Sequence, residues 1–268
     1  MDSRSTVTLH TGREMPVIGL GTWELTYDTP ENVEHALRIG YRMIDTAVDY
    51  GSQPGIGEAL DRTDVPRREI FLVAKVEEDE DAYDATRRYL DEMRQDYADL
   101  ILIHRPPPDG VGLGLWEGLR RAREDGLARE IGVSNFSIEQ LDRLADASGE
   151  VPVVNQIEWT PFGWSAAMLD YCDERGIVIQ AYSPLTRAER LNDDTLVELA
   201  AEYDATPAQI LLRWAIQKGT VPLPKANRKD HQAENLGAFD FEIGEGDMAT
   251  LDELNEHDSA LGPTLEYL

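Results

Sequence analysis

Three ionisable side chains stand at the ends of short apolar runs in the first half of the chain. Asp45 directly follows the run at residues 41–44, Lys75 ends the run at 69–75, and His104 ends the run at 97–104. Tyr50 comes five residues after Asp45. If these runs are parallel strands of a barrel, their carboxyl ends meet at one edge, where catalytic residues gather. We therefore expect the four side chains to lie together.

Such a group could polarise a carbonyl so that hydride attacks its carbon. A phenol has an ordinary pKa of about 10, and a nearby ammonium lowers it by favouring phenolate. Lys75 could supply that ammonium, Asp45 could hold it in place, and His104 could donate a second hydrogen bond to the same oxygen. Taken one at a time, these residues have structural explanations: Asp45 could cap a strand end, Tyr50 could serve in packing and His104 could be a core histidine. Lys75 resists such an explanation, because the chain otherwise has only Lys218, Lys225 and Lys229.

The elements that must position these residues alternate regularly. Apolar runs predict strands at 17–21, 41–44, 69–75, 97–104, 128–133, 151–155, 177–181 and 220–223. Helical spacing occurs at 29–39, 56–61, 82–93, 115–122, 138–145, 166–175, 193–202 and 207–217. This order predicts an α/β fold, a (β/α)8 TIM barrel. A doubly wound open sheet is the competing fold, but the glycine cluster at 51–57 lacks the spacing of a dinucleotide fingerprint.

The remaining segments fit around one barrel. Residues 6–18 read as a β-hairpin that could plug the closed end of the barrel, which would span 17–240. A helix or tail would occupy 241–268. Because no linker, low-complexity tract or shift in composition interrupts the chain, we expect residues 1–268 to form a single domain.

The composition narrows the setting of the protein. The chain has 268 residues, a formal net charge of −27 and one cysteine, Cys172. Its acidity predicts a hydrated surface suited to concentrated salt, and hence a salt-loving source. It disfavours a nucleic-acid or membrane partner, since phosphate binding needs basic patches. The polar start and the lack of long apolar runs predict a cytoplasmic protein. The histidines show no metal-ligand spacing, so we expect no metal.

At the proposed strand ends the sequence resembles the aldo-keto reductases. The matching segments follow the family order between residues 17 and 235: Gly19-Leu-Gly-Thr-Trp23, Ile44-Asp-Thr-Ala47 with Tyr50, Ala74-Lys75, Leu102-Ile-His104, Ile131-Gly-Val-Ser-Asn-Phe136, Asn155-Gln-Ile-Glu158, Ala181-Tyr-Ser-Pro184 and Leu223-Pro-Lys225. The resemblance implies a (β/α)8 barrel that transfers hydride between a nicotinamide cofactor and a carbonyl. With the acidic composition, it suggests a haloarchaeal-type member.

The resemblance also implies roles for individual residues. Asp45, Tyr50, Lys75 and His104 would form a catalytic tetrad, with Tyr50 as the general acid in reduction. Ser134, Asn135 and Gln156 would hold the nicotinamide amide, and Tyr182 would stack on the ring. The other cofactor-binding residues would be Gly21, Thr22, Trp23, Asp45, Ser183, Pro184, Leu185, Lys225, Ala226, Asn227, His231, Glu234 and Asn235. The substrate pocket would be formed by Trp23, Val48, Tyr50, His104 and Arg105, and Trp159 and Phe162 could add to its wall.

Two departures from the family pattern bear on specificity. The arginine that often pairs with the 2′-phosphate of NADP aligns with His231, and a histidine cannot bind phosphate bidentately. Arg228 and Lys229 lie close in the sequence and could compensate. We favour NADP(H), with NAD(H) or dual use left open. Arg105 stands where an aromatic residue often follows the histidine, so the rim could prefer polar or anionic substrates; an exposed structural arginine fits equally well.

Three kinds of function remain open at this point. The first is a monomeric carbonyl reductase that acts on small aldehydes, ketones or ketoacids. The second is a cofactor-binding sensor or regulatory subunit on the same barrel, against which the complete tetrad weighs. The third is a lyase that forms a Schiff base with Lys75 or Lys225, which nothing else at the strand ends favours.

Overall fold

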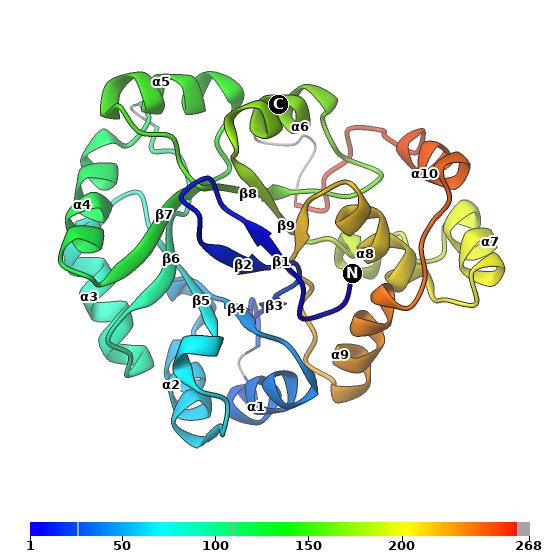
Figure 1. The fold of residues 1–268 in the computed structure, drawn as a ribbon, viewed down its shortest axis with the longest axis horizontal. Coiled ribbons are helices and arrows are strands. Elements are labelled where there is room, and N and C mark those ends of the chain that lie inside the picture. Colours follow the sequence, from blue (N-terminus) through cyan, green and yellow to red (C-terminus); the bar gives the residue numbers. More distant parts are fainter. Residues whose placement is uncertain (26, 109, 262–268) are drawn as a thin grey trace.

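A computed structural model describes residues 1–25, 27–108 and 110–261 of the chain. The described chain contains an antiparallel hairpin of β1 (Thr6–Thr8) and β2 (Glu14–Pro16), followed by a parallel sheet with eight strands in the order β3 to β10 (Figure 1). The strands of this sheet are β3 (Leu20–Gly21), β4 (Met43–Asp45), β5 (Phe71–Val76), β6 (Ala98–Ile103), β7 (Ala128–Ser134), β8 (Val154–Glu158), β9 (Val178–Tyr182) and β10 (Val221–Pro222).

Helices surround this sheet and alternate with its strands (Figure 1). They are α1 (Thr29–Ile39), α2 (Gln53–Arg62), α3 (Ala82–Met93), α4 (Leu113–Glu124), α5 (Ile138–Ser148), α6 (Ala166–Arg175), α7 (Asp194–Glu202), α8 (Pro207–Gln217), α9 (Lys229–Leu236) and α10 (Glu245–Asp252). The predicted (β/α)8 barrel with an N-terminal hairpin is therefore confirmed. Among the described residues, no helix combines the length and the apolar character needed to cross a bilayer.

The first and last strands meet at a seam that depends on glycine and proline. The backbone N–H groups of Gly19 and Gly21 donate to the carbonyls of Pro222 and Pro224, both at 3.1 Å. Proline has no N–H to give in return, so the paired region is short. Among the described residues, bridging across the seam is limited to Gly21 and Lys225. Strands β3 and β10 are bounded by their pairing with β4 and β9, and both are shorter than the strands predicted at 17–21 and 220–223.

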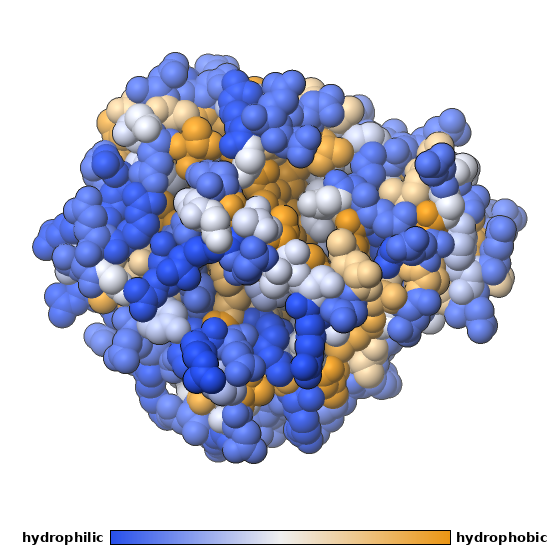
Figure 2. Space-filling model, in the orientation of Figure 1, coloured by the Kyte–Doolittle hydropathy of each residue, from blue (hydrophilic) through white to orange (hydrophobic). Residues whose placement is uncertain are grey.

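The hairpin covers one end of the barrel, as expected. Its side chains Leu9 and Met15 are buried in the same cluster as inward-facing strand residues such as Met43, Val73 and Leu100. The hairpin lies in front of the sheet in Figure 1, and in the same view Figure 2 shows hydrophobic residues near the middle of a largely hydrophilic face. Because described side chains fill this end, a ligand would reach the barrel from the opposite end.

The predicted helices differ from the observed ones at two places. Helix α9 (Lys229–Leu236) was not predicted, because it buries only Gln232 and Asn235 and shows almost no apolar periodicity. Helix α2 begins at Gln53, three residues before the predicted start. The expected C-terminal helix is α10 (Glu245–Asp252); residues 262–268 of the predicted tail lie outside the described residues. The single domain remains a prediction.

Candidate active site

A cleft of about 1000 Å³ opens where the barrel strands end. Most of the predicted site residues line it: Gly21, Trp23, Asp45, Tyr50, His104, Arg105, Ser134, Asn135, Gln156, Tyr182, Ser183, Pro184, Leu185, Lys225, Asn227, His231, Glu234 and Asn235. Thr22, Lys75 and Ala226 lie buried and are absent from the lining, as is the half-buried Val48. The lining also contains residues that were not predicted, among them Glu24, Asp49, Arg187, Leu191 and Leu261.

Lys75 is the centre of a buried polar cluster beneath this cleft. Its side chain is fully buried, and its Nζ donates to Asp45 Oδ1 at 2.8 Å, to the Thr46 carbonyl at 3.2 Å and to the Tyr50 hydroxyl at 3.4 Å. Strands β4 and β5 are neighbours in the sheet, which places Asp45 and Lys75 at the same edge. A lysine in so dry a position is stabilised only by partners of this kind.

The charges of the cluster set the protonation of its members. Burial alone would lower the pKa of Lys75, but the Asp45 carboxylate and the Tyr50 oxygen outweigh it, and the net shift is upward. Burial raises the pKa of Tyr50, and the opposing charge of Lys75 reduces this shift without reversing it. The lowering of the Tyr50 pKa that was expected from Lys75 is therefore present, but burial outweighs it. Tyr50 holds its proton at neutral pH, as a proton donor must.

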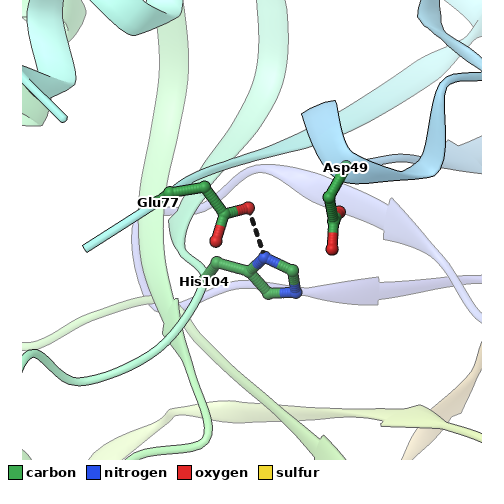
Figure 3. A group of neighbouring side chains, drawn as sticks. All are labelled: Asp49, Glu77 and His104. Carbon is green, nitrogen blue, oxygen red and sulfur yellow. Dashed lines mark hydrogen bonds and ion pairs between the residues drawn. The ribbon is translucent and has the colours of Figure 1, made fainter. Parts of the chain in front are cut away.

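His104 faces Tyr50 across the cleft and is held from behind by an acid. The two rings meet edge to face with their centres 6.1 Å apart. The Nδ1 atom of His104 lies 2.6 Å from Glu77 Oε1 (Figure 3). Glu77 belongs to an acidic run at 77–81, and the acidic composition predicted only a hydrated surface for such residues. No pattern in the sequence separates it from its neighbours; only the position after β5 brings it to His104.

Asp49 lies close to the same pair. One candidate atom from each of Asp49, Glu77 and His104 falls within 4.8 Å of the others (Figure 3). Groups of these types can bind a metal ion, but Glu77 and His104 already satisfy each other, so we assign no metal here.

The residues expected around the nicotinamide amide form one connected network. Ser134 Oγ donates to the Gln156 carbonyl at 2.7 Å, and Asn135 Nδ2 donates to Ser134 Oγ at 3.1 Å. The Tyr182 hydroxyl donates to Asn135 Oδ1 at 2.8 Å. Gln156 Nε2 donates to Asp45 Oδ2 at 2.8 Å, which ties this network to the lysine cluster. The donor set suits a planar carboxamide, because hydroxyl and amide groups supply both donors and acceptors.

Basic residues lie in and beside the segment from Lys225 to Asn235, which contributes to the cleft lining. Lys225 forms an ion pair with Glu24, at 3.3 Å. Arg228 Nε donates to Asp230 Oδ1 at 3.1 Å, and a second contact links the same two side chains. The Arg228 side chain is thus already engaged by its neighbour, while Lys229 and His231 are exposed. Free cationic groups for a phosphate are therefore fewer here than the sequence suggests.

A cation–π contact joins two residues of the cleft lining, Trp23 and Arg187. The Arg187 guanidinium lies 4.3 Å from the centre of the Trp23 ring. Arg187 belongs to a left-handed turn with Thr186 and Ala188, all at positive φ. Trp159 and Phe162, by contrast, are 0% and 1% exposed and are absent from the lining. Both side chains therefore pack in the interior, as loop packing would place them, and do not form the pocket wall.

Fold and site together define the class: a parallel barrel whose strand-end cleft combines a carboxylate–lysine–tyrosine cluster with a network suited to a carboxamide. Residues 17–256 match the aldo/keto reductase family. The chain belongs to this family and is an oxidoreductase of the NAD(P)H-dependent kind.

Relatives of known sequence and structure agree with this assignment. Glyoxal reductase from Bacillus subtilis is 36% identical over 271 residues, covering 99% of this chain and 98% of that protein. An aldo-keto reductase from a Mycobacterium species is 40% identical over 256 residues, covering 93% and 90%. The structure of the Bombyx mori aldo-keto reductase in complex with NADP superimposes with a TM-score of 0.91 at 32% identity, covering 98% and 96% of the two chains.

Proposed function

We propose that this protein reduces small aldehydes or ketones with NADPH, and that Tyr50 donates the proton to the carbonyl oxygen. The observation that carries this proposal is the contact of the buried Lys75 ammonium with the Tyr50 hydroxyl, at 3.4 Å. NADPH, when bound, supplies the hydride. As charge develops on the phenol oxygen, Lys75 stabilises it, and Asp45 holds Lys75 in its charged form. His104 lies opposite Tyr50 and orients the carbonyl.

The chain offers a place for each part of the cofactor. Ser134, Asn135 and Gln156 would hold the carboxamide, and Tyr182 would lie beside the ring. The backbone from Ser183 to Leu185 would follow the pyrophosphate, and the segment from Lys225 to Asn235 would hold the adenosine end. The NADP-bound Bombyx mori relative supports the same cofactor here. The engaged Arg228 makes the preference for NADPH over NADH smaller than a free arginine would.

A lyase that uses Lys75 is disfavoured by the same geometry. A Schiff base requires a neutral amine, whereas the raised pKa of Lys75 keeps the amine protonated. Lys225 is half-buried and paired with Glu24. The sensor function remains the alternative to catalysis, and consumption of NADPH in the presence of carbonyls separates the two.

The direct test is Tyr50→Phe, which removes one hydroxyl and keeps the ring. We expect turnover of glyoxal and other small aldehydes to fall by about a thousandfold or more, while NADPH still quenches the protein fluorescence with nearly unchanged affinity. Tyr83→Phe is a matched control, because its hydroxyl bonds Asp125 at the surface. Near-normal turnover by Tyr50→Phe would remove the proposed acid.

We also propose that the protein is a cytoplasmic monomer from a salt-loving source, a haloarchaeal-type family member. The net charge of −27 supports the salt-loving source, because repulsion between exposed acidic groups is screened as salt rises. The free energy of unfolding should increase when potassium chloride is raised from about 0.1 M to about 2 M. A decrease over that range would contradict the proposal, and sedimentation at both concentrations would test the monomer.

A further inference from the structure

The His104–Glu77 pair is built by two adjacent strands. β5 ends at Val76 and β6 ends at Ile103, and these two residues are register partners. Glu77 directly follows β5 and His104 directly follows β6, so the two residues lie side by side where the strands end. Their side chains are 22% and 9% exposed, and the backbone N–H of His104 donates to the Val76 carbonyl at 2.8 Å. The pair is therefore fixed by the sheet and is not a chance contact of mobile surface groups.

The proton between the two side chains belongs to the histidine. Burial favours the neutral form of Glu77, but the hydrogen bond to His104 and the charges of His104, Arg105 and Lys75 outweigh burial, and the pKa of Glu77 is lowered. Glu77 is thus ionised at neutral pH. An ionised carboxylate can only accept hydrogen bonds, so the Nδ1 atom of His104 must carry the hydrogen.

This arrangement limits what the other ring nitrogen can do. A neutral imidazole carries one hydrogen, and here Nδ1 holds it, so Nε2 is left as an acceptor. A substrate carbonyl oxygen is also an acceptor, and two acceptors do not bond. Only the doubly protonated ring can donate to Glu77 and to the substrate together.

Resting on the proposed function, we propose that Glu77 is a positioning residue that makes His104 act as an imidazolium during carbonyl reduction. In this state Nδ1–H donates to Glu77, and Nε2–H donates to the carbonyl oxygen. Tyr50 transfers the proton that becomes part of the alcohol, and His104 keeps both of its own. The positive ring stabilises the oxygen as it becomes negative.

Charged groups of both signs surround the ring. Glu77 from the end of β5 touches it, and Asp49 from the turn η1 (Val48–Tyr50) lies in the same group. Lys75 opposes the imidazolium, but its charge is largely balanced by Asp45 at 2.8 Å. Arg105 follows His104 and is exposed, where solvent screens it. The uncharged Tyr50 ring packs edge to face against the imidazole, and the Asn135 amide donates to the backbone carbonyl of His104.

The state of the ring can be read without any turnover. Long-range proton–nitrogen NMR of the uniformly ¹⁵N-labelled full-length chain distinguishes protonated from bare ring nitrogens, and the His104→Asn variant identifies the signals among the five histidines. As pH rises, we expect the wild-type ring to pass from the doubly protonated form to the form with hydrogen on Nδ1. A neutral ring with its hydrogen on Nε2 would overturn the proposal.

The kinetic test is Glu77→Gln. The introduced amide can donate as well as accept, so a neutral ring can place its hydrogen on Nε2 and still serve the substrate. For the wild type, kcat/KM for aldehyde reduction should fall steeply, by up to about tenfold for each pH unit, as pH rises toward about 9. For Glu77→Gln the fall over the same range, measured up to about pH 9, should be no more than about twofold.

Glu78→Gln is the matched control, because it removes the same charge from the next, exposed position and should leave the wild-type profile unchanged. Equal profiles for the wild type and Glu77→Gln, or a flat wild-type profile, would overturn the proposal. If neither the wild type nor any variant reduced a carbonyl, the proposed function would fail, whereas the NMR result would still decide which ring nitrogen of His104 carries its hydrogen beside Glu77.

Discussion

Replacing Lys75 by methionine tests the electrostatic link on which the proposed chemistry depends. The change keeps the length of the side chain and removes its charge, which lies 3.4 Å from the Tyr50 oxygen. At an effective dielectric constant of about 20, a full phenolate charge at that distance interacts with the ammonium by about 5 kcal/mol, and half a charge by about 2.4 kcal/mol. At 1.36 kcal/mol for each factor of ten, reduction should slow by between about 60-fold and about 4000-fold.

The assay is NADPH oxidation with a small aldehyde at neutral pH, with cofactor affinity measured separately by fluorescence. Lys218→Met is the matched control, because it breaks a comparable ion pair with Asp252, at 3.0 Å, and Lys218 is absent from the cleft lining. If Lys75→Met retained kcat/KM within about threefold of the wild type while remaining folded, the assigned role of the ammonium would be refuted.

The same variant should alter stability in a way that depends on pH. Loss of Lys75 leaves Asp45 buried without its cation, which costs about 3–5 kcal/mol. In the wild type the pKa of Lys75 is raised above its ordinary value of 10.5, so its contribution is present below that pH and is lost as pH rises through the folded-state pKa. Denaturant unfolding should therefore show a smaller difference between the two proteins at strongly alkaline pH than at neutral pH.

Two further predictions concern cofactor preference and packing. Asp230→Asn frees Arg228 to bind the 2′-phosphate of NADPH, and His231→Arg adds a second guanidinium there. Each should increase the ratio of NADPH affinity to NADH affinity by about tenfold. An unchanged ratio in both variants would mean that another group binds the 2′-phosphate. Gly57→Ala would place a Cβ atom 2.6 Å from the Met93 carbonyl oxygen and should destabilise the protein by about 1–3 kcal/mol. Gly114→Ala, which meets nothing within 4 Å, should gain no more than about 1 kcal/mol in thermal unfolding.

Helices with strong local signals could be predicted closely from the sequence. Helix α3 (Ala82–Met93) has the predicted bounds because Asp81 caps its first turn and an apolar stripe runs along it. Helix α6 (Ala166–Arg175) begins after the Ser165 cap and ends at Gly176, which takes a positive φ. Helix α9 lacks both signals and was missed. The short seam strands depend on pairing between distant segments, which a local pattern does not contain.

The candidate site was predictable where residue type and strand end coincide, as for Asp45 and Lys75. Glu77 was not, because it looks like any other member of an acidic run until β5 and β6 are placed side by side. The effect of Lys75 on the pKa of Tyr50 was predictable, but the larger effect of burial was not, since it depends on how deeply the phenol is buried. The ion pair between Arg228 and Asp230 was not predicted either, and it reduces the number of cationic groups free to bind the cofactor phosphate.

The seam between Gly19–Gly21 and Pro222–Pro224 has a consequence for how the polypeptide is made. The two segments that pair at the seam are separated by about two hundred residues of sequence. During synthesis on the ribosome, the first segment therefore has no partner until most of the chain has been made. During that interval the nascent sheet presents an unpaired edge, the kind of surface that invites aggregation. Fragments that stop before residue 222 should therefore be poorly soluble. Chaperones should bind the nascent chain until the segment from Pro222 to Pro224 has been synthesised.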